Sequence, residues 1–257
     1  MSELRLNHYL SKAGVCSRRE ADRLIEQGRV LVNGVPASVG TKVEGTEDIV
    51  CDGVPVKSMP EQVVLAVNKP VGVVCTTASF PGEVSIIEMV NYPQRVFPVG
   101  RLDKASKGLI LLTNDGALSE KISRGANRHE KEYLVSVNKE ITLEFLEKMR
   151  TGVPILDTVT RPCKVYKKSP TSFAIILTQG LNRQIRRMCE ALEYRVTSLQ
   201  RVRVMNITLD GLAEGKWRRL TKEEIDGLMK AGRGSRPETD KAAKEPGRNY
   251  HGGKRKT

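Results

Sequence analysis

The chain has 257 residues and a formal net charge of +13, with 43 lysines and arginines against 30 aspartates and glutamates. This length is sufficient for one large domain or for a small and a medium domain, each with its own core. The positive charge favours a polyanionic partner, either nucleic acid or an anionic membrane surface. Because no run of about 18 apolar residues occurs and MSELRLNHYL lacks the apolar core of a secretory signal, we expect a cytoplasmic protein without a membrane span.

Residues 1–62 show the pattern of two short helices followed by a small sheet. Apolar residues at helical spacing in RLNHYLSKA predict the first helix, and Ser17 with Glu20 forms an S-x-x-E capping box that predicts the start of the second. The segments RVLV and DIVC run into Asn33-Gly34 and Asp52-Gly53, which are both two-residue hairpin signals. The helical half is basic, which is typical of an RNA contact but also of a solvated helix face.

Residues 63–230 alternate between strand-like and helical patterns, with strands in the majority. Apolar runs predict strands in VVLAVN, VGVVCTT, GLILLT, YLVSV, CKVYKK, FAIILT and RVTSLQRVRVM. Helical spacing predicts helices in SIIEMV, ALSEKI, ITLEFLEKM, RQIRRMCEAL and KEEIDGLM.

Residues 231–257 contain almost no large apolar side chain and carry excess positive charge. The sequence therefore predicts a disordered basic tail. Nonspecific attraction of phosphates and inert solubilisation are both open as its role.

The composition offers little material for metal or cofactor chemistry. The 5 cysteines and 3 histidines are scattered, without a C-x-x-C pair or a histidine cluster, so we expect reduced, packed cysteines and no metal site. Neither G-x-G-x-x-G nor a P-loop occurs, so no nucleotide cofactor is predicted.

A polar, glycine-bounded loop between two apolar strands holds a candidate catalytic carboxylate, Asp103, in the run FPVGRLDKASKG. Loops held by a rigid scaffold commonly carry chemistry. A single aspartate in a loop is more often a cap or turn residue. The interpretation of Asp103 therefore depends on the residues that accompany it.

Two further segments contain residues that suit a site around this carboxylate. QGLNRQIRRM follows a predicted strand and opens a predicted helix, so its three arginines gather near a helix N-terminus, where the dipole favours anions. A carboxylate removed from water needs a cationic partner to stay ionised, although a solvated helix surface would also explain these arginines. In HEKEYLV, Tyr133 follows Lys131 by two residues at the start of a strand, where a core or cross-strand tyrosine is the commoner role.

Taken together, these motifs resemble the RsuA-type ribosomal pseudouridine synthases. The shared motifs are N-K-P-x-G (Asn68 to Gly72), G-R-L-D-x-x-S-x-G-L-x-x-L-T-N-D-G (Gly100 to Gly116), K-x-Y (Lys131 to Tyr133) and G-x-N-R-Q-I-R-R-M (Gly180 to Met188). Within that family, HEKEYLVSV, GVPILDTVT, QGLNRQIRRMCE and RVRVMNITL are most similar to enzymes of the large ribosomal subunit. Residues 4–50 also resemble the small RNA-binding fold called the alpha-L motif.

The resemblance implies an α+β fold. Residues 1–62 would form an alpha-L RNA-binding domain, and residues 63–230 a pseudouridine synthase catalytic domain with a mixed, mainly antiparallel sheet. The enzyme would isomerise a specific uridine of ribosomal RNA, in the large subunit, to pseudouridine.

The resemblance also implies roles for individual residues. Asp103 would be the nucleophile, Arg186 would pair with its carboxylate, and Tyr133 would lie against the flipped uracil. Arg101 would help to push the uridine out of the RNA stack. The remaining residues expected to contact RNA are Arg18, Arg19, Arg23, Arg183 and Arg187.

The implied reaction agrees with these residue types. It breaks the bond from ribose to ring nitrogen, rotates the uracil and rejoins it through carbon, so no net redox change occurs and no cofactor is expected. The carboxylate could attack the uracil ring or help to form a ribose intermediate, and the sequence leaves both routes open. A flipped base suits an aromatic face and an arginine wedge.

Two alternatives for the function stay open at this stage. The same chemistry could act on small-subunit ribosomal RNA or on tRNA. The chain could instead be a non-catalytic ribosome-assembly factor that binds RNA. In each case we expect a structured RNA, such as a hairpin or stem-loop, as the partner, and a monomeric protein.

Overall fold

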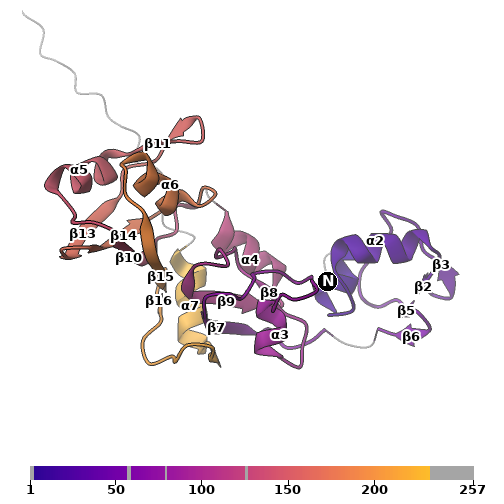
Figure 1. Cartoon of the computed structure of the whole chain (residues 1–257). Coiled ribbons are helices and arrows are strands. Elements are labelled where there is room, and N and C mark those ends of the chain that lie inside the picture. The colour runs from indigo at the N-terminus through magenta and orange to yellow at the C-terminus, as the bar shows by residue number, and fades with distance from the viewer. Residues whose placement is uncertain (1–2, 57–58, 79, 125–126, 232–257) are drawn as a thin grey trace, which may run out of the picture.

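The computed structural model describes residues 3–56, 59–78, 80–124 and 127–231. A small domain built from the first of these ranges lies at one end of the molecule, beside a larger domain with a nine-stranded sheet (Figure 1). The basic tail predicted from the sequence lies outside the described residues, apart from Ala231 at the end of the last helix. Among the described residues, no helix combines the length and apolar character needed to cross a bilayer.

The small domain contains two helices and short strands, as predicted. Helix α1 spans Leu6–Lys12, and α2 spans Arg18–Glu26. A four-stranded sheet has the order β3 (Val35–Pro36), β2 (Val30–Val32), β5 (Ile49–Cys51), β6 (Val54–Pro55). In a separate two-stranded sheet, β1 (Leu4–Arg5) pairs with β4 (Lys42–Val43). Both predicted hairpins form, with positive φ at Asn33-Gly34 and Asp52-Gly53. Ser17 Oγ accepts from Glu20 N at 3.2 Å, which confirms this half of the predicted capping box.

The large domain is organised around the nine-stranded sheet. Its main path runs β13 (Lys164–Ser169), β14 (Ser172–Leu177), β10 (Lys131–Val137), β15 (Val196–Val204), β9 (Lys107–Thr113), β7 (Val64–Lys69), β17 (Trp217–Arg219). Strand β8 (Phe97–Pro98) pairs with β9, and β16 (Ile207–Thr208) pairs with β15. The helices are α3 (Ile86–Val90), α4 (Gly116–Ser123), α5 (Leu143–Thr151), α6 (Gln184–Ala191) and α7 (Lys222–Ala231).

One strand pair divides this sheet into two halves. Along the main path every pair is antiparallel except β9 with β15, which run parallel through Lys107↔Gln200 and Gly108↔Arg201. On one side, α5 and α6 cover strands β10, β13, β14 and β15 with a shared apolar core. On the other, β7 and β9 are buried on both faces, by α3 on one face and by α4 and α7 on the other. The predicted mixed, mainly antiparallel sheet is therefore confirmed.

The predicted strand in VGVVCTT is wrong. Gly72 has a φ of +93°, and Val74 makes only an isolated bridge with Ser85. Val71 is exposed, whereas Val73 and Cys75 are buried within a loop: Val73 O accepts a hydrogen bond from Lys69 Nζ, and Cys75 Sγ accepts one from Leu102 N. An apolar run that supports a neighbouring loop has the same composition as a buried strand.

Candidate active site

A pocket of about 310 Å³ lies where the two halves of the sheet meet. Its size is at the lower end of the range typical of small-molecule sites, roughly 300–1,000 Å³. It brings together side chains from five parts of the chain; those with polar groups include Arg101, Asp103, Ser106, Arg124, His129, Lys131, Tyr133, Gln179, Arg183, Arg186 and Arg201. Among the described lining residues, Asp103 is the one acidic side chain, so the pocket is strongly cationic around a single carboxylate.

Neighbouring backbone holds the loop that carries Asp103 in place. Ser106 N donates to Asp103 O at 3.0 Å, which closes a turn directly after the carboxylate, and Gly72 N donates to Lys104 O at 2.8 Å. The Asp103 side chain is 38% exposed, so it is more accessible than the carboxylate removed from water that the sequence suggested. The reason is its place at the wall of an open pocket.

Arg186 connects helix α6 to this loop. Its Nη2 donates to Ala105 O at 2.9 Å and to Ser106 Oγ at 3.3 Å. Its Nε lies 4.0 Å from Asp103 Oδ2, which is ion-pair distance but too long for a hydrogen bond. Among the described residues this buried Nε–H has no hydrogen-bond partner. A small shift of the carboxylate would form a charge-assisted bond with this donor.

Tyr133 and Lys131 lie on the same face of β10, because alternate residues of a strand share a face. Tyr133 is half-buried and packs against the cores of both halves of the sheet, which fixes the ring at the pocket wall. Burial lowers the pKa of Lys131 to about 8, and the positive charge of Arg201 acts in the same direction. The pocket therefore holds a lysine that loses its charge far more readily than an exposed one.

Arg201 is a pocket residue that the sequence did not single out. It is almost fully buried on β15, and its Nε donates to Leu109 O at 2.6 Å. The sequence feature that could have indicated its role is the position of this arginine inside the predicted strand RVTSLQRVRVM, among apolar residues. A strand pattern alone does not show which buried arginine meets a catalytic loop.

Gly108 explains why β9 and β15 approach each other at this point. Its φ is +104°, and a Cβ added there would lie 2.2 Å from Arg201 O and 2.8 Å from Arg201 N. The glycine in the motif is therefore required both by its backbone conformation and by the close strand contact.

Lys69, from the N-K-P-x-G motif, supports the site from beneath. It is fully buried, and its Nζ donates to Pro70 O at 2.8 Å and to Val73 O at 2.9 Å. Burial lowers the pKa of this amine. The bonds hold the 70–75 loop, which in turn contacts the Asp103 loop through Cys75 and Gly72.

The residues expected to contact RNA separate into several groups. Arg101 and Arg183 line the pocket and are exposed. Arg187 instead donates to Asn182 O and Oδ1 at 3.1 and 3.2 Å, and it does not belong to the described pocket lining.

The three arginines of α2 lie in the small domain, away from the pocket. Arg18 lines a hollow of about 780 Å³ between the two domains, together with His8 and Lys12. Arg23 pairs with Glu20 at 2.6 Å, and Arg19 is exposed. These residues could act only on parts of an RNA outside the pocket.

Comparison with known proteins gives the same two domains. Residues 63–191 match the family described as RNA pseudouridylate synthase, and residues 4–50 match the S4 domain. The chain is 51% identical to the dual-specificity RNA pseudouridine synthase RluF of Salmonella typhi, over 93% of this chain and 83% of the relative. It is 35% identical to the ribosomal large subunit pseudouridine synthase B of Bacillus subtilis, over 87% of this chain and 95% of the relative.

A solved structure supports the same conclusion. A crystal structure of a pseudouridylate synthase, 28% identical, covers 88% of this chain and 99% of its own, with a TM-score of 0.65. The predicted resemblance to the RsuA-type synthases is thereby confirmed. The chain belongs to the RNA pseudouridylate synthase family.

Proposed function

We propose that this enzyme isomerises a uridine of large-subunit ribosomal RNA to pseudouridine, with Asp103 as its nucleophile. The observation that carries the proposal is the placement of the Asp103 carboxylate in a cationic pocket, 4.0 Å from the buried Nε–H of Arg186, which has no hydrogen-bond partner in the part of the chain that the structure describes. A catalytic carboxylate needs this kind of partner to stay ionised when a substrate displaces water. The Bacillus subtilis relative is a pseudouridine synthase of the large ribosomal subunit.

The pocket residues suit the steps of this reaction. A base inside folded RNA must be extruded before an enzyme can reach it. Arg101, exposed beside Asp103, would occupy the space that the base leaves, and Tyr133 would lie against the flipped uracil. Asp103 would then assist cleavage of the bond between ribose C1′ and uracil N1. After the ring turns, C1′ bonds to C5, and the C5 proton is lost while N1 gains one.

The cationic surroundings suit a polyanionic substrate. Arg183 at the pocket, and Arg18, Arg19 and Arg23 on α2, would contact phosphates of the RNA around the target. Arg187, in the N-terminal half of α6 and bonded to Asn182, would do so only outside the pocket. A structured stem-loop, a monomeric enzyme and a cytoplasmic location complete the proposal. Because RluF is named a dual-specificity enzyme, a second RNA substrate such as tRNA is an alternative to test.

Replacing the carboxylate tests the proposal directly. Asp103→Asn keeps the side-chain shape but removes the nucleophile, so the turnover rate should fall at least about a thousandfold. RNA affinity should change by less than about threefold, because phosphate contacts dominate it. The measurement is tritium release from RNA labelled at uridine C5, alongside a binding titration with the same RNA.

A matched control is Asp226→Asn, which changes an exposed carboxylate on α7 and should leave the rate at the wild-type value. Activity that survives Asp103→Asn would refute the assigned nucleophile. A wild-type enzyme that binds ribosomal RNA but releases no tritium would instead support the non-catalytic assembly factor.

A further inference from the structure

We propose that the hairpin of β11 (Pro154–Ile155) and β12 (Thr158–Val159) contacts the RNA and places Leu156 against a nucleobase close to the target uridine. This inference rests on the proposed function, because it takes RNA as the partner. In Figure 1 the hairpin stands out from the domain beside α6, the helix that carries Arg186.

The turn of this hairpin has a residue that its geometry disfavours. Leu156 and Asp157 both have positive φ, +49° and +57°, the arrangement found in type I′ turns. Such turns prefer Asn-Gly or Asp-Gly, and the two hairpins of the small domain have those residues. A leucine in the left-handed region is strained by its Cβ.

Core packing does not account for this leucine. Leu156 is 45% exposed, and Val159 on the adjacent strand is 61% exposed. Exposed apolar side chains in a strained turn do not stabilise the folded chain, so their placement suits a contact with another molecule. Apolar side chains of this size are known to pack against or between bases.

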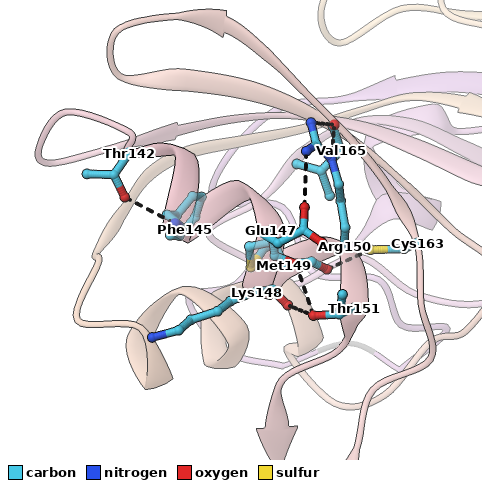
Figure 2. A network of polar contacts seen from close by, with 9 residues as sticks. All are labelled: Thr142, Phe145, Glu147, Lys148, Met149, Arg150, Thr151, Cys163 and Val165. Carbon is cyan, nitrogen blue, oxygen red and sulfur yellow. Dashed lines mark hydrogen bonds and ion pairs between the residues drawn. The ribbon is translucent and has the colours of Figure 1, made fainter.

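The hairpin is held rigidly at its base. Gly152 approaches so closely that a Cβ there would lie 2.5 Å from Thr160 O, and Val153 N donates to Thr160 Oγ1 at 2.9 Å. Figure 2 shows hydrogen bonds between α5 and the segment that leads into β13. Arg150 donates twice to Val165 O, at 3.1 and 3.0 Å, and Cys163 Sγ donates to Met149 O at 3.1 Å. The tip therefore projects from a fixed platform.

This platform adjoins the pocket. Arg161, directly after the hairpin, donates its backbone N–H to Gln179 Oε1 at 3.0 Å, and Gln179 lines the pocket. The buried Ile155 belongs to the same core as Ile185, another pocket residue. Arg161 follows the hairpin, and Arg183 lies at the start of α6, which contacts β11; both are exposed. Together with the acidic Asp157 of the turn they leave a net positive charge in this region, which complements RNA and not a second copy of this basic chain.

The variant Leu156→Asn separates binding from folding. Asparagine tolerates the left-handed region, so the melting temperature should stay level or rise by about 2–4 °C. Loss of the apolar contact should raise the Kd and the KM about tenfold, with kcat little changed. The probe is an unmodified large-subunit rRNA transcript, used in binding titrations at several salt concentrations and in tritium release.

Salt dependence and a second leucine provide the controls. The contact of Leu156 is apolar, so Leu156→Asn should leave the slope of log Kd against log salt unchanged. Arg161→Gln should make that slope shallower by the amount that corresponds to the loss of about one phosphate contact. Leu143→Asn is the matched control, since Leu143 is 85% exposed at the start of α5 and should show wild-type binding.

A Leu156→Asn variant that folds and binds the transcript within about twofold of wild type would overturn the inference. So would a wild-type dimer in sedimentation that this substitution dissociates, because the tip would then contact a second copy. Failure of the proposed function would give a different result from failure of this inference, because the wild-type enzyme itself would then release no tritium. The binding titration still tests the hairpin in that case.

Discussion

The charged side chains of the pocket differ in how the fold controls their protonation and orientation. Arg186 is held by two acceptors on the Asp103 loop, and its Nε–H, which no other described residue accepts, lies at ion-pair distance from the carboxylate. Lys131 has no such acceptor of comparable strength; its described bond, to His129 O, is 3.4 Å long. Burial therefore dominates its behaviour, and its pKa falls to about 8.

The pKa of Lys131 predicts a pH dependence of stability. Between about pH 8 and the ordinary value of 10.5, the unfolded chain still binds the proton that the folded lysine has lost. The contribution of Lys131 to the free energy of unfolding therefore rises with pH across this window, as the penalty for its buried charge disappears. Urea unfolding gives the free energies of unfolding of wild type and Lys131→Met. Between about pH 8 and 10.5, their difference should change by about 1–3 kcal/mol in favour of wild type.

The comparison with Lys131→Met isolates this one residue, since every other titrating group is shared by both chains. Lys168→Met changes an exposed lysine and should give a difference that stays flat over the same window. A flat difference for Lys131→Met as well would mean that the folded lysine titrates as it does in the unfolded chain.

The elements meet at the parallel contact of β9 and β15, and this contact explains how the site is assembled. It places the Asp103 loop, which enters β9, beside Arg201 of β15 and next to β10 with Tyr133. The two halves of the sheet have separate cores, which Tyr133 contacts from both sides, and the pairing of β9 with β15 helps to fix their relative position.

Gly108→Ala should therefore destabilise the enzyme strongly. An added Cβ would collide with the Arg201 backbone, and strand backbone gives way only at a large cost. We expect the melting temperature to fall by at least about 5 °C, which corresponds to a loss of about 2 kcal/mol or more. Thermal unfolding followed by circular dichroism measures this change.

Gly100→Ala is the control at the other end of the same loop. Gly100 also has a positive φ, +72°, but a Cβ there meets nothing within 4 Å. Gly100→Ala should therefore lose only the smaller amount of stability that corresponds to placing an alanine at a positive φ. Equal losses in both variants would show that the collision with β15 does not matter.

At the scale of the whole molecule, the excess positive charge lies in the large domain and in the sequence after it, whereas the small domain is basic only in its helical half. The small domain presents basic residues of α1 and α2, including Lys12 and Arg18 at the hollow between the domains. The catalytic pocket presents its own arginines. An RNA that reached both regions would be bound at several separate points. Substitutions far from the pocket should therefore change the RNA affinity without changing the turnover rate.

Removal of the C-terminal segment tests this separation. Because α7 extends to Ala231, the truncation begins at residue 232. Loss of its positive charge should weaken RNA binding roughly three- to tenfold at low salt and make the salt dependence shallower, while kcat at saturating RNA stays unchanged. Binding titrations and tritium release check both parts. A truncated enzyme that is inactive at saturating RNA would give the segment a role in catalysis.

Much of the fold could be predicted from the sequence, because the signals concerned are local. The two helices of the small domain, both of its hairpins and most strands of the catalytic domain follow from apolar spacing and from Asn-Gly and Asp-Gly turns. The motif resemblance likewise placed Asp103, Tyr133 and Arg186 in one site, and they do line one pocket.

Other features arise from contacts between residues distant in the sequence, which local periodicity does not encode. The loop at residues 71–77 looked like a strand because it is rich in apolar residues. Its hydrogen bonds, however, are made with the Lys69 side chain and with the backbone of Leu102 and Lys104, and not with a neighbouring strand in a ladder. Arg201 became a pocket residue only when β15 met β9, and the exposure of Asp103 depends on how wide the pocket stands open. Burial and pairing are properties of the packed chain, so they required the tertiary structure.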